Sequence, residues 1–516
     1  MIGASAGSSI MYTAAASLGL APASTYRGPV QLDGAPQGVS VLILGAGLAG
    51  LVAAFELRRA GYKVQILEYR DRVGGRSWTL RGGDVYTELG GDTQRVAFEQ
   101  GQYFNPGPWR IPYHHRGMLD YCGRFGVALE PFINVNYNAY LHQRSAFEGK
   151  PQRFREVYSD YHGAVAELLA KVTRRGKLDE LVTKEDQEKL LEALRARGAL
   201  DEEFRYVEGF DSSERRGFKS PPGGGIHGKP VVSGSPVSLS QLLQSELWRF
   251  LGSDNFEFQS PMFQPVGGMD RLAQAFGREL NEVVRFNAKV TAIKQDANGV
   301  VVAYEDTTAK GAPPATAKAD WCLCTIPLSI LSQIDMNVSA EMSRGIGAVP
   351  YGASVKTGLQ FKRRFWEQDE QIYGGISYTD LPNQQIGYPS TGFASSGKGI
   401  LLGAYVWGRQ AYETSGLSPE ERIQQALEAG ARIHPQYRTE FDTGVSVAWH
   451  RVPWALGCSG DWTEVNREAH YQNLCQIDGR ILLAGEHLSY LPAWQEGAIL
   501  SSLDAISRLH QRIVAR

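Results

Sequence analysis

The chain has 516 residues, 43% of them hydrophobic and 21% charged, with a formal net charge of −2. This length and composition are typical of a globular protein of two or three domains, and the balanced charge gives no support for a nucleic-acid partner or an anionic membrane surface. The five scattered cysteines exclude a disulfide framework, and no apolar run reaches the about 18 residues that a membrane span requires.

The first 23 residues are small, apolar and rich in Ala, Gly and Ser, and they end in Ala21-Pro-Ala23. They resemble the later part of a secretory signal, but no Lys or Arg precedes Arg27, and the twin-arginine box of exported flavoproteins is absent. We therefore expect a helix packed on the body of the protein and a cytoplasmic location. Descent from an exported bacterial enzyme is compatible with this segment.

The next pattern is a strand, a glycine-rich turn and a helix. Four apolar residues, Val41 to Leu44, predict a buried parallel strand, and residues 51–60 predict a helix. The turn between them has G-x-G-x-x-G spacing, with its glycines at Gly45, Gly47 and Gly50. A second strand, Lys63 to Leu67, ends at the acidic residue Glu68. Strand, turn, helix, strand and acid in this order predict a dinucleotide-binding unit.

Each part of this unit has a physical role. Gly45 permits the tight turn, Gly47 lets the backbone approach a pyrophosphate, and Gly50 lets helix and strand pack closely. We expect the turn, including Ala46, and the free N–H groups of the helix N-terminus to hold phosphate charge. Glu68 is placed to bond a ribose hydroxyl.

The following residues narrow the nucleotide to a flavin. The segment Tyr69-Arg-Asp-Arg-Val-Gly-Gly-Arg76 resembles the R-x-G-G-R segment of FAD-dependent amine oxidases. Its glycines allow close backbone contact, and Arg72 and Arg76 can offset phosphate charge. Far along the chain, Arg480-Ile-Leu-Leu-Ala-Gly-Glu-His487 and Ala493-Trp-Gln-Glu-Gly-Ala498 resemble the C-terminal flavin block of the same family.

The resemblance implies bound FAD. It assigns cofactor contacts, beyond the glycine turn and Glu68, to Arg70, Gly74, Gly75, Arg76, Pro108, Trp109, Arg110, Val290, Gly485, Glu486 and Ala498. Because no cysteine lies in or just before residues 493–498, we expect the FAD to be non-covalent. Dimers are common in the family, so a homodimer is expected.

The family resemblance and the hydrophobic periodicity together predict an α/β fold in three parts. Helical spacing dominates residues 150–200 and recurs at residues 242–250, a Gly/Pro-rich loop is expected at 211–236, and strands are expected at 283–293, 321–327, 355–361, 400–406 and 445–450. The prediction is a Rossmann-like FAD domain with a mixed-sheet substrate domain and a helical domain. The expected bounds are 38–105, 260–345 and 456–516 for the FAD domain, 1–37, 106–145 and 346–455 for the substrate domain, and 146–259 for the helical domain.

Within the family, the chain resembles L-amino-acid oxidases most. The segment Gly107-Pro-Trp-Arg-Ile-Pro112 is similar to the G-P-x-R-[IL]-P segment whose arginine binds the substrate carboxylate. That residue is Arg110, and a planar guanidinium matches a carboxylate with two parallel hydrogen bonds. The resemblance also implies that the Tyr388 hydroxyl gives the carboxylate a second hydrogen bond.

Lys356 lies in the middle of an apolar strand, where a lysine is costly unless it has a task or a partner. The family places a lysine in this strand, bonded through water to flavin N5, where it assists reoxidation by dioxygen or positions water. Lys356 and Trp494 are therefore the predicted catalytic residues. The resemblance places Trp494 in an aromatic wall and gives the Ala493 carbonyl to the substrate amine.

Other candidates have weaker support. Trp407 and Trp366 could line the side-chain pocket, although core packing is the better interpretation for both. His114 and His115 could act as a base or a gate, and a structural role is at least as well supported. Cys322 and Cys324 alternate along a strand and are interpreted as buried structural thiols, so no metal site is predicted.

These residues predict FAD-dependent oxidative deamination of an L-amino acid. Hydride transfer from Cα to flavin N5 would yield an imino acid that hydrolyses to a 2-oxo acid and ammonia, and dioxygen would be reduced to hydrogen peroxide. The alternatives are an L-amino-acid 2-monooxygenase, an oxidase of amines that lack a carboxylate, and a non-catalytic flavoprotein. The side-chain preference stays open.

Overall fold

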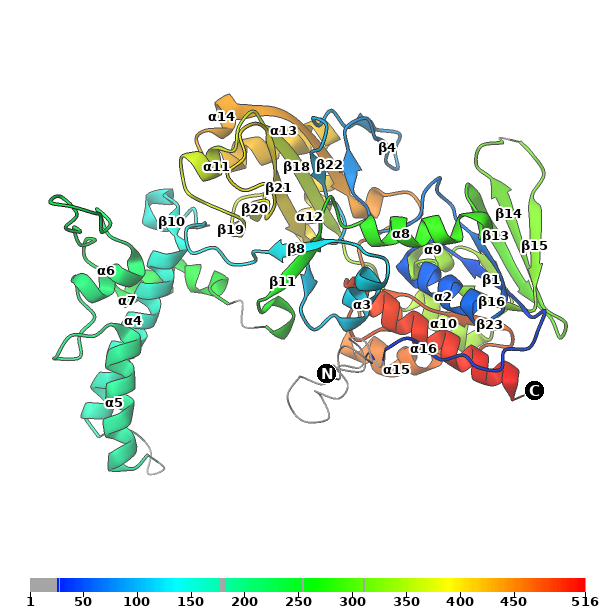
Figure 1. The fold of residues 1–516 in the computed structure, drawn as a ribbon, viewed down its shortest axis with the longest axis horizontal. Helices are drawn as coiled ribbons and strands as arrows, with labels where there is room; N and C mark the ends of the chain where they lie inside the picture. Colours follow the sequence, from blue (N-terminus) through cyan, green and yellow to red (C-terminus); the bar gives the residue numbers. More distant parts are fainter. Residues whose placement is uncertain are drawn as a thin grey trace.

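A computed structural model describes residues 26, 28–176, 178, 182–252, 255–309 and 311–515. The helix expected before residue 24 lies outside the described residues. Within the described part, no helix is both long enough and apolar enough to cross a membrane. Figure 1 shows three regions: a nucleotide-type sheet with its helices, a second large sheet beside it, and a group of helices that projects from the body.

The predicted strand–turn–helix–strand unit forms the centre of a parallel five-stranded sheet. Its strand order is β12-β2-β1-β16-β23. The bounds are Val284–Arg285 (β12), Lys63–Leu67 (β2), Ser40–Leu44 (β1), Trp321–Cys324 (β16) and Ile481–Leu483 (β23). Side chains on β1 alternate between two cores, with Val41 and Ile43 in one and Leu42 and Leu44 in the other. Both faces are therefore covered, as in doubly wound α/β folds.

Helices α2 (Leu48–Arg59), α8 (Arg271–Leu280) and α16 (Gln495–Val514) contribute to the first of these cores. The second core includes residues of a small sheet and of nearby helices. This sheet has the order β15-β14-β13-β17. Its strands are Ala315–Ala319 (β15), Val300–Asp306 (β14), Ala288–Gln295 (β13) and Asp335–Met336 (β17). The helices are Leu328–Leu331 (α9), Ala340–Gly347 (α10) and Glu464–Leu474 (α15). The single strand expected at 283–293 is thus two strands, β12 and β13, in different sheets.

The second large sheet is mixed and seven-stranded, with the order β10-β9-β19-β20-β21-β18-β22. The predicted strands at 355–361, 400–406 and 445–450 correspond to β18 (Ser354–Phe361), β21 (Gly399–Trp407) and β22 (Phe441–Ala448). The remaining strands are Gln152–Arg153 (β10), Tyr140–His142 (β9), Ile376–Thr379 (β19) and Gln385–Gly387 (β20). Every residue of β18 is buried, including Lys356.

Helices α12 (Gly408–Ser415) and α13 (Pro419–Gly430) contribute to the core on one face of this sheet. Short helices α11 (Phe365–Gln368) and α14 (Tyr437–Glu440) add Phe365, Trp366 and Tyr437 to the same core. Two small ribbons pair β3 with β6 and β4 with β5. Their bounds are Leu80–Arg81, Tyr103–Phe104, Val85–Thr87 and Thr93–Arg95.

A three-stranded sheet, β7-β11-β8, holds the segment that follows Arg110. Its strands are Ile111–Pro112 (β7), Met262–Pro265 (β11) and Leu129–Phe132 (β8). Strand β7 leads through His114 and His115 into helix α3 (Arg116–Arg124). The pairing of β7 with β11 therefore fixes the end of the segment that carries Arg110.

The projecting helices include α4 (Phe154–Arg174), α5 (Lys184–Gly198), α6 (Phe210–Arg216) and α7 (Leu239–Ser245). The prediction of a loop at 211–236 is wrong at its start, because residues 211–216 belong to helix α6. The helix expected at 242–250 is also interrupted: Glu246 has a φ of 55°, and the 3₁₀ helix η2 (Leu247–Phe250) follows it. All five cysteines are free, and the buried positions of Cys322 and Cys324 agree with their predicted structural role.

Candidate active site

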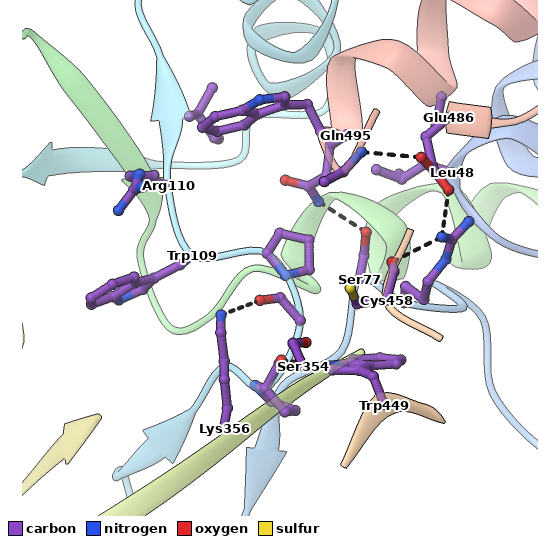
Figure 2. A pocket seen from close by; sticks show the side chains of 18 of the residues that line it. Leu48, Ser77, Trp109, Arg110, Ser354, Lys356, Trp449, Cys458, Glu486 and Gln495 are labelled. Atoms are coloured by element: carbon purple, nitrogen blue, oxygen red, sulfur yellow. Dashed lines mark hydrogen bonds and ion pairs between the residues drawn. The ribbon is translucent and has the colours of Figure 1, made fainter. Parts of the chain in front are cut away.

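A cavity of about 500 Å³ lies where the nucleotide-type sheet, the seven-stranded sheet and the Arg110 segment meet. Its walls come from the start of α2, residues 74–77 and 106–111, strands β18 and β21, and residues 485–498. Figure 2 shows Trp109, Arg110 and Lys356 on one side, with Leu48 and Glu486 on the other. The volume is within the range of ligand pockets.

The glycine turn has the geometry expected of a phosphate site. Gly45 has a φ of 101°, and a Cβ at Gly50 would come within 2.0 Å of the Gly45 carbonyl oxygen, so only glycine fits there. A Cβ at Gly47, by contrast, would meet no atom within 4 Å, and Gly47 lines the cavity. Helix α2 begins here without a side-chain cap. Open space beside an uncapped helix N-terminus fits a nucleotide phosphate.

Glu68 is buried and holds the turn in place. Its carboxylate accepts hydrogen bonds from the N–H of Ala46 at 2.6 Å and from the N–H of Arg70 at 2.9 Å. The Arg70 guanidinium in turn donates to the Pro453 carbonyl oxygen. A contact between Glu68 and a ribose hydroxyl stays a prediction, and it would use the carboxylate lone pairs that the backbone leaves free.

Arg76 and Glu486, both predicted to contact the cofactor, contact each other. The Arg76 guanidinium lies 2.6 Å from the Glu486 carboxylate, although the two residues are 410 positions apart in the sequence. The guanidinium also donates to the Cys458 carbonyl oxygen. Burial raises the pKa of Glu486, but Arg76, His487 and the N–H of Ala493 outweigh burial and keep that pKa below its ordinary value. The pair is a fixed dipole in the cavity wall.

Lys356 is 2% exposed and has no carboxylate partner among the described residues. Its ammonium group donates to the Gly107 carbonyl oxygen at 2.6 Å and lies 4.2 Å from the centre of the Tyr405 ring. Burial, reinforced by the nearby charge of Arg110, lowers the pKa of Lys356 to about 7. The lysine is therefore close to the midpoint of its titration at neutral pH.

Arg110 has no ion-pair partner among the described residues either. One terminal nitrogen of its guanidinium is buried without a hydrogen-bond partner. The group lies between aromatic rings, 4.8 Å from the centre of Phe258 and 5.5 Å from that of Trp109. Burial lowers the pKa of Arg110. A buried guanidinium without an anion is unfavourable, so this end of the cavity suits an anionic ligand.

The prediction that Tyr388 binds the substrate is wrong for this cavity. Tyr388 is 1% exposed in the core of the seven-stranded sheet, where its hydroxyl contacts Ser377 at 2.7 Å and His434 at 2.6 Å. It lies three residues after Gln385, which does line the cavity. Because side chains alternate along extended chain, this odd spacing puts Tyr388 on the opposite face.

The structure brings other tyrosines to Arg110 that the sequence analysis missed. Tyr405 and Tyr378 line the cavity, and the charge of Arg110 acts on both hydroxyls. Tyr405 pairs directly with Lys356 in the register of β18 and β21. No local sequence signal identifies Tyr405, because its position depends on the register between β18 and β21. Further cavity residues without a prediction include Ser77, Phe258, Ser354, Trp449, Cys458 and Gln495.

The C-terminal block also reaches the cavity. Ala493 has a φ of 67°, a left-handed conformation that is strained for alanine and that glycine adopts freely. Its N–H donates to Glu486 at 3.0 Å. Trp494 lines the cavity and precedes the first residue of α16, and Ala498 lies one turn further along. Trp494 is thus part of the cavity wall, and its place beside a flavin stays a prediction.

The predicted residues therefore divide into two groups. Those that line the cavity are Gly47, Gly74, Arg76, Pro108, Trp109, Arg110, Lys356, Trp407, Gly485, Glu486, Ala493, Trp494 and Ala498. Those that do not are Gly45, Ala46, Gly50, Glu68, Arg70, Arg72, Gly75, Val290, Trp366 and Tyr388. Val290 is buried on β13 and Trp366 in the core, and cofactor contact at Val290 stays a prediction. His115 lines the cavity, and His114 lines a neighbouring one.

Comparison with known proteins gives consistent results. The family model of flavin containing amine oxidoreductases matches residues 48–509. YobN of Bacillus subtilis strain 168 is 30% identical, covering 90% of this chain and 93% of its own. L-amino-acid oxidases of Siganus canaliculatus and Gloydius blomhoffii are 26% and 29% identical, over 92% and 90% of this chain and 85% and 88% of theirs.

Among solved structures, putrescine oxidase bound to putrescine matches with a TM-score of 0.59. The match covers 93% of this chain and 99% of that protein at 18% sequence identity. At this identity the likeness concerns the fold.

Proposed function

Because the chain belongs to the family of flavin-containing amine oxidoreductases, we propose that it is an FAD-dependent L-amino-acid oxidase. It would convert an L-amino acid and dioxygen into a 2-oxo acid, ammonia and hydrogen peroxide. The observation that carries this proposal is the guanidinium of Arg110, which lines the cavity without an acidic partner among the described residues.

A substrate carboxylate would supply the missing anion at Arg110. Two parallel hydrogen bonds to the guanidinium would fix the orientation of the substrate, and the aromatic neighbours Trp109 and Phe258 keep water away from the pair. The hydroxyls of Tyr378 and Tyr405 are candidate second donors in place of Tyr388.

The charges of the cavity also argue against a diamine. Of the described residues that line it, Glu486 alone is an acid, and Glu486 is already paired with Arg76. A second ammonium group would therefore approach Arg110 and Lys356 without a free carboxylate to bind it. A single amine beside a carboxylate fits these charges better, and the amine would react in its neutral form.

The residues fit FAD at the nucleotide end. Gly47 offers open space, the start of α2 offers N–H groups, and Arg76 adds a positive charge held by Glu486. When bound, the flavin accepts the hydride from Cα and passes the electrons to dioxygen. Lys356 would hold a proton or a water molecule in the cavity, and its hydrogen bond to Gly107 joins β18 to the Arg110 segment. We propose that the FAD is non-covalent.

The decisive experiment is a hydrogen peroxide assay with matched pairs of substrates. L-phenylalanine is compared with phenethylamine, and L-leucine with 3-methylbutylamine, before the survey is extended to all twenty L-amino acids. We expect peroxide from amino acids and none above background from their decarboxylated counterparts. Faster turnover of the amines would replace this proposal with an oxidase of simple amines, and a purified protein without bound flavin would remove both.

The homodimer and the cytoplasmic location stay predictions. Light scattering during size-exclusion chromatography tests the first, and fractionation of the producing cells tests the second.

A further inference from the structure

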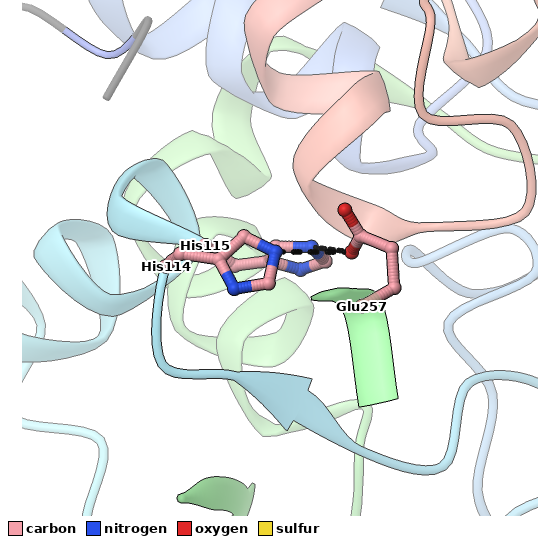
Figure 3. A group of neighbouring side chains, drawn as sticks. All are labelled: His114, His115 and Glu257. Atoms are coloured by element: carbon pink, nitrogen blue, oxygen red, sulfur yellow. Dashed lines mark hydrogen bonds and ion pairs between the residues drawn. The ribbon is translucent and has the colours of Figure 1, made fainter. Parts of the chain in front are cut away.

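Two histidines and a glutamate converge beside the proposed active site. The Glu257 carboxylate oxygen Oε2 lies 2.8 Å from Nε2 of His115 and 3.2 Å from Nε2 of His114. The ligand atoms of all three residues lie within 4.8 Å of one another. Figure 3 shows the two imidazole rings turned toward the same carboxylate.

Separate elements hold these side chains in place. The histidines lie between β7 and α3, whereas Glu257 comes from the 3₁₀ helix η3 (Phe256–Phe258). The ring of His114 stacks on Phe256 with centres 4.0 Å apart, and the ring of His115 meets Trp494 edge-on at 5.0 Å. The rotamers of both histidines are thus restrained by packing, which lowers the entropy cost of binding a ligand.

The hydrogen bonding of His114 is incomplete. Its approach to Glu257 lacks hydrogen-bond geometry, and both of its ring nitrogens are buried without a hydrogen-bond partner among the described residues. Buried polar atoms in native proteins are normally satisfied, so this imidazole points to a ligand. One lone pair on each histidine and one charged carboxylate oxygen form a His₂Glu donor set.

This donor set matches the requirements of zinc. Two ligands at about 2.0–2.1 Å from a tetrahedral ion are roughly 3.3 Å apart, close to the separations of Glu257 from the two histidines. Three protein ligands leave a fourth position open to water. The site also lies at a boundary, since His114, His115 and Glu257 line a second cavity of about 530 Å³ and His115 lines the first as well.

We propose that His114, His115 and Glu257 form a binding site for a divalent transition-metal ion of the zinc type. The ion lies in the wall between the two cavities, with its open position toward the second. It is separate from the flavin chemistry. Because His114 follows Arg110 by four residues and His115 packs on Trp494, the bound ion restrains both walls of the substrate end.

Isothermal titration of EDTA-treated, untagged holoenzyme with zinc chloride tests the proposal without any substrate. We expect one site per chain, and affinity at least ~10-fold lower in His114→Ala and in Glu257→Gln, because each variant loses one of three ligands. His227→Ala and His470→Ala remove histidines elsewhere and should bind as the parent does. Circular dichroism and flavin content check that the variants are folded.

Cobalt gives a second, spectroscopic measurement. A tetrahedral cobalt complex should add absorption bands at wavelengths longer than those of the flavin, and Glu257→Gln, which keeps the shape of the side chain, should lose them. The proposal is overturned if the parent binds no zinc, or if either His114→Ala or Glu257→Gln binds it as tightly as the parent. Neither result depends on whether the protein oxidises amino acids.

Discussion

Lys356 donates a hydrogen bond of 2.6 Å to the carbonyl oxygen of Gly107 and so joins strand β18 to the segment that carries Arg110. The two unpaired cations of the cavity are therefore mechanically connected. They are also electrostatically connected, because the charge of Arg110 adds to burial in lowering the pKa of Lys356. An anion bound at Arg110 would weaken this repulsion and favour the protonated lysine.

The protein should purify yellow, and acid precipitation should release the flavin into the supernatant. Of the cysteines that the structure describes, Cys458 lines the cavity, and its thiol donates to the Gly352 carbonyl oxygen at 3.0 Å. Colour retained in the pellet would show that the prediction of non-covalent FAD is wrong. The variant Cys458→Ala then decides whether this thiol is the point of attachment.

Arg110→Ala should lower kcat/KM for an L-amino acid by ~30-fold or more, because a charge-assisted pair in a desolvated site contributes on the order of 2–5 kcal/mol. Flavin content should not change. Tyr388→Phe is the control, since the Tyr388 hydroxyl is bonded inside the core. Steady-state kinetics of both variants make the comparison, and parental activity in Arg110→Ala would remove Arg110 from the site.

Lys356→Met should slow the reaction of the reduced enzyme with dioxygen more than it slows reduction by substrate. The reason is that the lysine faces the cavity as a proton donor without an acid partner among the described residues. Stopped-flow measurement of each half-reaction separates the two effects. If the oxidative half-reaction proceeds at the parental rate, Lys356 has a structural role only.

The stability of the protein should also depend on Lys356 in a defined pH window. The folded-state pKa is about 7 and the ordinary value is 10.5, so between these values the unfolded chain binds more protons and the stability of the parent rises with pH. A methionine contributes no such rise. From pH 7 to pH 9.5, the stability of Lys356→Met relative to the parent should therefore fall, by up to about 3 kcal/mol.

Thermal midpoints of parent and variant at several pH values measure this difference. Lys362→Met removes an exposed lysine just past the end of the same strand and serves as the control. A constant difference between parent and Lys356→Met across the window would mean that Lys356 is not held in a desolvated state.

Product analysis distinguishes the oxidase from the monooxygenase. Both reactions begin with hydride transfer from Cα, and they differ in whether the imino acid leaves before dioxygen reacts. The Gly107 to Pro112 segment resembles the oxidase pattern, so we expect peroxide and 2-oxo acid in roughly stoichiometric amounts with the oxygen consumed. Mass spectrometry after complete consumption of one substrate makes the measurement. An amide one carbon shorter, with carbon dioxide and little peroxide, would identify a monooxygenase.

Local sequence patterns predicted those parts of the site that depend on the residues of a single segment. The glycine turn follows from spacing, because Gly50 has no room for a Cβ, and Lys356 stands out because its strand is otherwise apolar. Arg110 was predicted from a six-residue resemblance, and the structure adds what the sequence could not show, namely the absence of an acid beside it among the described residues.

The predictions were wrong or incomplete where the position of a side chain depends on how segments far apart in the sequence pack or pair. Tyr388 and Tyr405 are both tyrosines near strand ends, and only the pairing of β18 with β21 shows that Tyr405 faces Lys356. The contact of Arg76 with Glu486 spans 410 residues and carries no local signal. His114, His115 and Glu257 form a cluster only because η3 folds back onto the turn before α3.

The parallel sheet has a consequence for how the protein is made. Three adjacent strands of this sheet, β1, β16 and β23, come from residues 40–44, 321–324 and 481–483. Strands that pair in the folded protein are therefore synthesised at widely separated times. A ribosome must pass residue 480 before the last strand can pair and before α16 can cover the hydrophobic face of β1 and α2. Until then these apolar surfaces stay exposed to solvent, and such intermediates are prone to aggregation. Slow translation near the 3′ end of the message should therefore lower the yield of folded enzyme, and chaperones that shield apolar surface should restore it.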